Sequence, residues 1–84
     1  MNITFLKLAN DEEVEVDSWE KATHCEISCD RETRAEDLLE AGVWIGKHAR
    51  SIADYTLFEP YSEEPYIEVH KKAPKSVLKE RGIL

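Results

Sequence analysis

Two strand-like runs separated by only two residues open the chain, and this spacing limits what it can fold into. Residues 2–9 are rich in Ile, Phe and Leu, and residues 12–19 alternate between acidic and apolar side chains. Asn10 and Asp11 stand between the runs, and both residue types tolerate the positive φ that a two-residue hairpin needs. The sequence therefore predicts an antiparallel hairpin. Apolar residues on both faces of the first run predict that it lies inside a sheet.

The second run predicts a row of carboxylates. If Val14 and Val16 face the core, strand alternation sends Glu13, Glu15 and Asp17 to solvent at intervals of about 6.6 Å. Two interpretations of such a row are possible. It can be charge that protects an edge strand from aggregation, or a recognition surface whose spacing is similar to that of nucleic-acid phosphates, roughly 6–7 Å apart.

A third strand and a helix are expected next. Residues 23–29 alternate so that Cys25, Ile27 and Cys29 share one face. Thr33 and Glu36 form a capping-box pattern, which predicts the start of an amphipathic helix over residues 34–55. The alternative ends this helix near residue 42 and makes residues 43–49 a strand.

The two glycines of the expected helix, Gly42 and Gly46, lie near its buried face and predict a close approach of helix to sheet. Two further strands follow, the second of them over residues 66–70, and Ser76 and Gly82 would bound a short terminal helix. The predicted fold is one α+β domain, residues 1–84, with a mainly antiparallel sheet of about four or five strands and one long amphipathic helix packed on it.

Nothing in the sequence matches a catalytic or cofactor motif, so we expect a protein that is not an enzyme and binds no cofactor or metal. The residues that could ligate zinc are His24, Cys25, Cys29 and His48, but strand alternation separates His24 from the cysteines. On one strand, Cys25 and Cys29 would stand about 13 Å apart, beyond the ~7 Å that a disulfide spans. Buried, reduced thiols are therefore expected. Together with the absence of a signal-peptide or membrane-spanning run, they favour the cytoplasm.

The charge balance is strongly acidic, with 18 Asp and Glu against 11 Lys and Arg among 84 residues. Residues 1–40 carry twelve of these acids, whereas residues 71–84 are basic. An acidic body repels nucleic acid and anionic membranes and attracts basic proteins. We therefore expect a monomer or weak dimer that binds a basic surface of a host nucleic-acid-binding complex. Glu32, Glu36 and Glu40 would add a second acidic row at helical spacing, and Trp19 could anchor the contact. The expected binding residues are Asp11, Glu12, Glu13, Glu15, Asp17, Trp19, Glu20, Glu32, Glu36 and Glu40.

In its size, its acidity and its lack of catalytic motifs, the chain resembles the small anti-CRISPR proteins of phages. That group shares no diagnostic motif, so the resemblance assigns no role to any residue. It implies an inhibitor that works in the host cytoplasm, binds a CRISPR effector such as a type I complex, and blocks DNA capture by charge mimicry.

A different class of function is a small interaction or toxin-neutralising module that docks mainly through apolar contacts. The two classes differ in their dependence on salt. Binding through rows of charge weakens steeply as ionic strength rises, whereas apolar docking is nearly insensitive to it.

Overall fold

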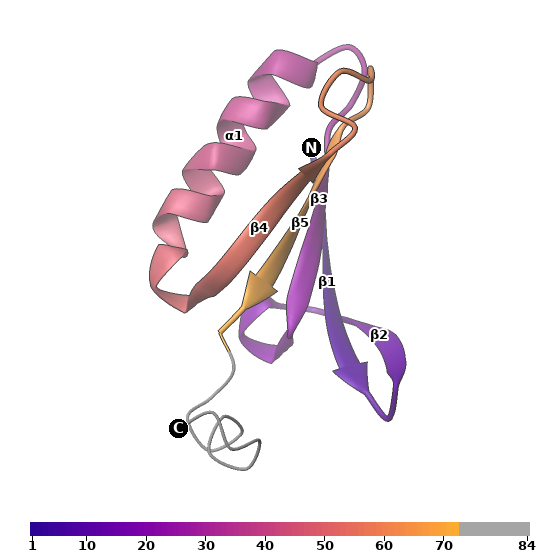
Figure 1. Ribbon diagram of the computed structural model, residues 1–84, viewed down its shortest axis with the longest axis vertical. Helices are drawn as coiled ribbons and strands as arrows, with labels where there is room; N and C mark the ends of the chain where they lie inside the picture. Colours follow the sequence, from indigo (N-terminus) through magenta and orange to yellow (C-terminus); the bar gives the residue numbers. More distant parts are fainter. Residues whose placement is uncertain (73–84) are drawn as a thin grey trace.

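The computed structural model describes residues 1–72, and its five strands form a single sheet beside one helix (Figure 1). The predicted short helix between Ser76 and Gly82 lies outside the described residues. In chain order the elements are β1 (Asn2–Ala9), β2 (Glu12–Val16), the 3₁₀ turn η1 (Trp19–Lys21), β3 (His24–Ser28), α1 (Arg34–Lys47), the 3₁₀ turn η2 (Ala49–Ser51), β4 (Ile52–Phe58) and β5 (Tyr66–Lys71).

The strands lie side by side in the order β2-β1-β3-β5-β4, and every neighbouring pair is antiparallel. The predicted α+β class and the order of strands and helix are confirmed. The predicted hairpin is also present, since Asn10 and Asp11 connect β1 to β2 with φ of 52° and 64°. β1 is an interior strand, as its apolar side chains on both faces predict.

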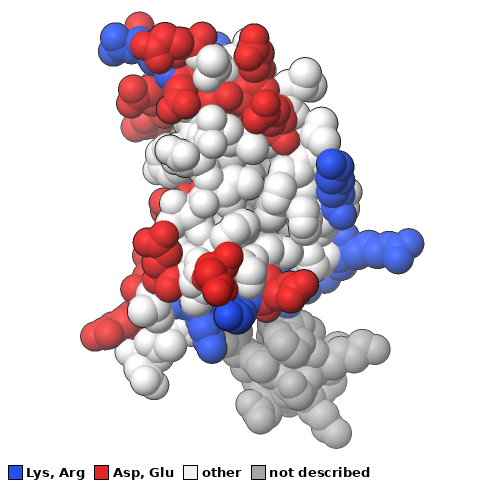
Figure 2. Space-filling view, turned by 180° about the vertical axis from the view of Figure 1, so that it is seen from behind, with Lys and Arg blue, Asp and Glu red and all other residues white. Residues whose placement is uncertain are grey.

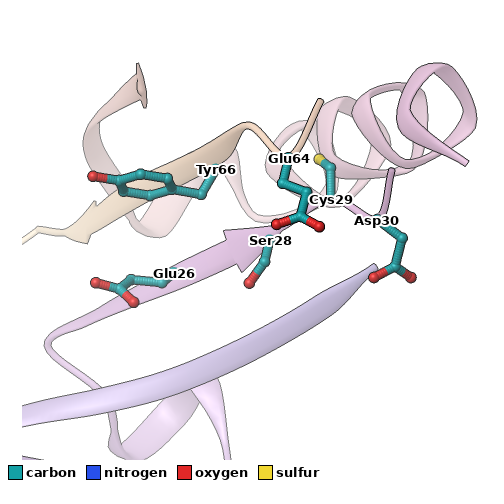
Figure 3. A pocket seen from close by; sticks show the side chains of 6 residues that line it. All are labelled: Glu26, Ser28, Cys29, Asp30, Glu64 and Tyr66. Atoms are coloured by element: carbon teal, nitrogen blue, oxygen red, sulfur yellow. The ribbon is translucent and has the colours of Figure 1, made fainter. Parts of the chain in front are cut away.

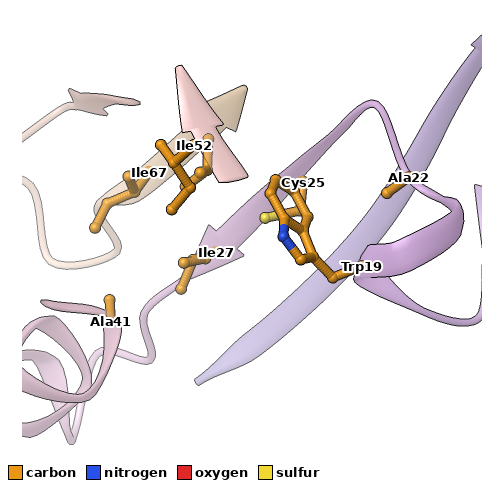
Figure 4. Packing of buried hydrophobic residues seen from close by; sticks show 8 residues of the cluster. Trp19, Ala22, Cys25, Ile27, Ala41, Ile52 and Ile67 are labelled. Carbon is orange, nitrogen blue, oxygen red and sulfur yellow. The ribbon is translucent and has the colours of Figure 1, made fainter. Parts of the chain in front are cut away.

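The hydrophobic core fills the space between α1 and one face of the sheet. Cys25 and Ile27 of β3 and Val69 of β5 are fully buried there, and Ala41 of α1 is buried with them. Figure 4 shows Ile52, Ile67 and Ile27 on neighbouring strands, with the Trp19 ring beside Cys25. Alternation along β3 thus divides apolar from polar residues as the sequence predicts.

Trp19 closes one end of this core. Its ring meets the Trp44 ring edge to face, with centroids 5.3 Å apart, and its Nε1 donates to Ser51 Oγ at 2.9 Å. The indole N–H therefore has a partner although the side chain is buried, which avoids the cost of an unsatisfied donor.

α1 begins at the predicted position, but not by the predicted mechanism. Thr33 is the N-cap residue, yet its side chain makes no capping hydrogen bond. Its hydroxyl donates instead to Asp37 Oδ2 at 3.0 Å, as does the Asp30 backbone N–H at 2.8 Å. The α-amino group of Met1 lies 3.2 Å from the same oxygen. The capping box with Glu36 is therefore wrong, because the buried carboxylate of Asp37 takes the hydroxyl.

The helix ends sooner than predicted, at Lys47, and β4 takes residues that were expected to be helical. The alternative of a strand over residues 43–49 is also wrong, since most of that segment lies in α1. Gly42 and Gly46 do not mark a close approach to the sheet. Both are exposed, and a Cβ built on either would find nothing within 4 Å. Among the helices of residues 1–72, none has the length and apolar character needed to cross a bilayer.

Candidate protein interface on the open sheet face

Side chains on one face of the sheet point away from α1, and no element among residues 1–72 packs over them. We call this surface the open face. Residues opposite each other on neighbouring strands share a face, so the strand register assigns its members. Its carboxylates come from four strands: Glu13 and Glu15 from β2, Glu26 from β3, Glu68 from β5 and Asp54 from β4.

No lysine or arginine of the five strands belongs to the open face. Lys7 lies opposite Val14 and Lys71 opposite Ile52, which places both on the helix side. Glu26 and Glu68 stand directly opposite each other on β3 and β5. Like charges in that position destabilise a sheet, so this face bears a cost that interspersed charges would remove.

Two histidines lie in the middle of the open face and bind two of its carboxylates. The rings of His24 and His70 stack with centroids 5.6 Å apart. Nε2 of His24 lies 2.8 Å from Glu13 Oε1, and Nε2 of His70 lies 2.7 Å from Glu68 Oε1. Because a carboxylate only accepts, each histidine donates from Nε2.

His24 is buried, and Thr23 Oγ1 lies 2.8 Å from its Nδ1. The remaining acids of the face, Glu15, Glu26 and Asp54, make no ion pair within residues 1–72. Among the residues that the structure describes, these three exposed carboxylates thus have no charged partner.

A shallow hollow of about 390 Å³ lies at one end of the open face (Figure 3). The carboxylates of Glu26, Glu64 and Asp30 are spaced along it, and the Tyr66 ring lies on the same side as Glu26. Ser28 and Cys29 complete its lining. A hollow with carboxylates and an aromatic ring suits the head group of a lysine or arginine side chain.

The predicted carboxylate row on β2 exists only in part. Glu13 and Glu15 point to the open face, but β2 ends at Val16, before Asp17. Asp17 instead forms an ion pair of 3.1 Å with Lys21, which lowers the pKa of its carboxyl group through their hydrogen bond. β2 is an edge strand of the sheet. That position agrees with the alternative in which its charges protect an edge.

The valines of β2 are less buried than predicted. Val14 is 50% exposed, and only Val16 packs against the core. Both valines point to the helix side of the sheet, as predicted, but Val14 is not covered there, because β2 extends past the area that α1 covers (Figure 1).

Trp19 is not a surface anchor, since only 8% of it is exposed. The prediction that Trp19 anchors a partner is therefore wrong, because its side chain lies in the core beside Trp44. The other predicted binding residues are exposed: Asp11, Glu12, Glu13, Glu15, Asp17, Glu20, Glu32, Glu36 and Glu40.

These exposed acids do not form one surface. α1, with Glu36 and Glu40, begins at the top of the view in Figure 1, whereas β2 lies at the lower right. Glu32 precedes the helix. Figure 2 likewise shows acidic side chains at the top and in the lower half of the molecule, with a largely uncharged area between them. The two predicted rows are therefore separate features.

The binding residues predicted from the sequence did not include Glu26, Glu68 or Asp54, which the sheet brings onto the same face as Glu15. Alternation within each strand assigns a residue to a face, and it puts Glu26 on the face of β3 that faces away from Cys25 and Ile27. It does not say which strands are neighbours, so the face as a whole could not be assembled.

Cys25 and Cys29 are free and buried. Burial raises the pKa of the Cys25 thiol to about 12, and burial also raises the pKa of Cys29. Within residues 1–72, no three His, Cys, Asp or Glu side chains are grouped so that they could hold a metal ion. Both thiols are thus protonated at neutral pH. A protonated thiol is neither a nucleophile nor a good metal ligand.

The structure thus shows an α+β domain whose sheet has one open, acidic face. No protein-family model, curated protein or solved structure matches the chain.

Proposed function

We propose that this protein binds the basic, nucleic-acid-binding surface of a partner protein and inhibits it by occupying that surface. The observation that supports this proposal is the open face, which carries five carboxylates and no lysine or arginine from the strands. A partner that binds nucleic acid presents Lys and Arg at phosphate spacing. Glu15, Glu26 and Asp54 are the carboxylates available to pair with them.

The unfavourable pairing of Glu26 with Glu68 supports a binding role over a role in solubility. A protein that needs only solubility gains it from charges of both signs, without directly opposed carboxylates. Lysine or arginine side chains of a partner would relieve this repulsion, so part of the cost in the free protein becomes binding energy in the complex. The hollow beside Tyr66 offers a place for one of these side chains.

A type I CRISPR effector is the first partner to test, because the chain resembles anti-CRISPR proteins in size and charge. The assay measures capture of labelled target DNA by the purified effector in the presence of this protein. Wild type should lower DNA capture, and the inhibition should weaken steeply between low and physiological salt. Inhibition that is insensitive to salt would favour apolar docking instead.

The test variant is Glu15→Lys/Glu26→Lys, because both side chains are exposed and neither makes an ion pair within the described residues. A triple change that includes Glu13 and Asp17 is less informative, since it would also break their contacts with His24 and Lys21. The double variant should fold as wild type, with a change within about 0.5 kcal/mol.

The matched control is Glu36→Lys/Glu40→Lys, which makes the same change of charge on α1. Binding through the open face predicts that the test variant inhibits at least tenfold more weakly, whereas the control stays close to wild type. Equal losses in both variants would mean that only net charge matters, and no loss in either would refute the proposed interface.

A further inference from the structure

The free edge of β4 differs from the other edge of the sheet. β2 carries three glutamates in five residues, and such charges discourage pairing with another strand. β4 has the sequence IADYTLF, with Asp54 as its one charge and neither lysine nor proline. Its five consecutive residues 53–57 are exposed, and β5 is its only neighbouring strand among the described residues.

The exposed side chains of β4 suit strand pairing. Tyr55 is 58% exposed and Leu57 42%, and both point to the helix side of the sheet, opposite Val69 and Ile67 of β5. Aromatic, β-branched and large apolar residues stabilise cross-strand contacts. A long, exposed and nearly uncharged edge strand is a template for another strand.

We propose that β4 pairs with β4 of a second copy of this chain, giving a two-fold dimer with one continuous sheet. This inference is independent of the proposed function. An antiparallel pairing that overlaps the whole strand is centred on Tyr55, so that this ring meets its own copy at the two-fold axis. Asp54 then lies opposite Thr56 of the second copy, where the hydroxyl can donate to the carboxylate.

The charges that flank β4 are complementary in this arrangement. Arg50 precedes the strand and Glu59 follows it, and both are exposed without an ion pair within residues 1–72. Antiparallel pairing brings Arg50 of each copy beside Glu59 of the other, which forms two ion pairs per dimer. One strand pair with few side chains buries less than a standard interface of about 800 Å² per partner. We therefore expect a weak dimer, with a Kd of about 10⁻⁵ to 10⁻³ M.

The first experiment is sedimentation equilibrium of the full chain from about 1 µM to about 1 mM. The mass should rise from monomer to dimer. Tyr55→Lys places two ammonium groups together at the two-fold axis and should weaken the dimer more than tenfold. Leu39→Lys is the matched control, because Leu39 is 72% exposed on α1, away from the β4 edge, and it should dimerise as wild type does. A monomer throughout the range, or equal weakening by both variants, overturns the proposal.

A charge exchange tests the register directly. Arg50→Glu alone and Glu59→Arg alone each put like charges together at both ends of the homodimer, so each should dimerise more weakly than wild type. A mixture of the two single variants restores both ion pairs and should form heterodimers. Weak homodimers without a gain in the mixture would rule out this register.

Amide hydrogen exchange distinguishes a second copy from other occupants of the edge. The outward-facing amides of β4 should exchange freely in the dilute monomer and become protected where the dimer forms. Protection at concentrations where the mass is that of a monomer would show that another part of the same chain covers the edge, and would overturn the proposal.

Discussion

Replacing Gly42 by alanine should stabilise the protein. Gly42 lies inside α1, it is exposed, and a Cβ there meets nothing within 4 Å. The new methyl group therefore neither clashes nor gains packing, and the effect reduces to helix propensity. Glycine is less favourable than alanine by about 0.8–1.0 kcal/mol in an exposed helix interior. For a domain of this size the gain corresponds to a rise in Tm of about 4–8 °C.

Urea unfolding followed by tryptophan fluorescence measures this effect, because Trp19 and Trp44 both pack in or against the core. Gly42→Ala should raise the unfolding midpoint without changing the slope of free energy against urea. Gly46→Ala should gain less, since α1 ends one residue later. Ala41→Gly is the control of opposite sign, because Ala41 is fully buried, and it should cost about 2 kcal/mol through propensity and a lost buried methyl group. A destabilised Gly42→Ala variant would refute the reasoning, since it would mean that α1 packs against the chain at this position.

Three further predictions concern the core and the ionisable groups. Ile27→Ala should lower the free energy of unfolding by about 2–5 kcal/mol and Ile27→Val by about 0.5–1.5 kcal/mol in urea unfolding, because Ile27 is fully buried; equal effects would contradict its tight packing. The hydrogen bond to Asp37 raises the pKa of the Met1 α-amino group above its ordinary 8.0, so the stabilisation from that amine should be complete below pH 8 and lost as pH rises through the raised pKa. The pKa of Asp37 is lowered, chiefly by a backbone hydrogen bond, so its contribution should be present above about pH 4 and lost as pH falls; urea unfolding across pH should show both losses, and Asp37→Asn should remove them. Cys25 and Cys29 should react with a thiol reagent only after unfolding, because both thiols are buried with raised pKa values; fast labelling of the native protein would contradict this.

Local patterns in the sequence were enough to predict the order of strands and helix, the first hairpin and the fold class. The end of α1 was not predictable in this way. Ala49 and Ile52 continue the helical spacing of apolar residues, yet Ile52 begins β4 and pairs with Lys71. Pairing with a distant strand decides the conformation here, and a single local period cannot show it.

The candidate interface was predicted only where it depends on alternation within one strand. Glu13 and Glu15 were correctly assigned to a common face of β2. Glu68 and Asp54 join that face only because β5 and β4 follow β3 in the sheet. The partial exposure of Val14 likewise depends on how far α1 reaches across the sheet, which is a property of the packed structure rather than of the strand.

The strand order also determines when the protein can fold as it is synthesised. β1 with β2 and β4 with β5 are hairpins that need only short loops, but an isolated hairpin is marginal in water. β3 joins the two hairpins, and its second partner, β5, lies on the far side of α1 in the chain. Closing that long loop costs entropy before its contacts form, and non-local pairings of this kind slow folding. On the ribosome, β3 has one partner strand until Lys71 has emerged, so the sheet is completed only after the whole of β5 has been synthesised.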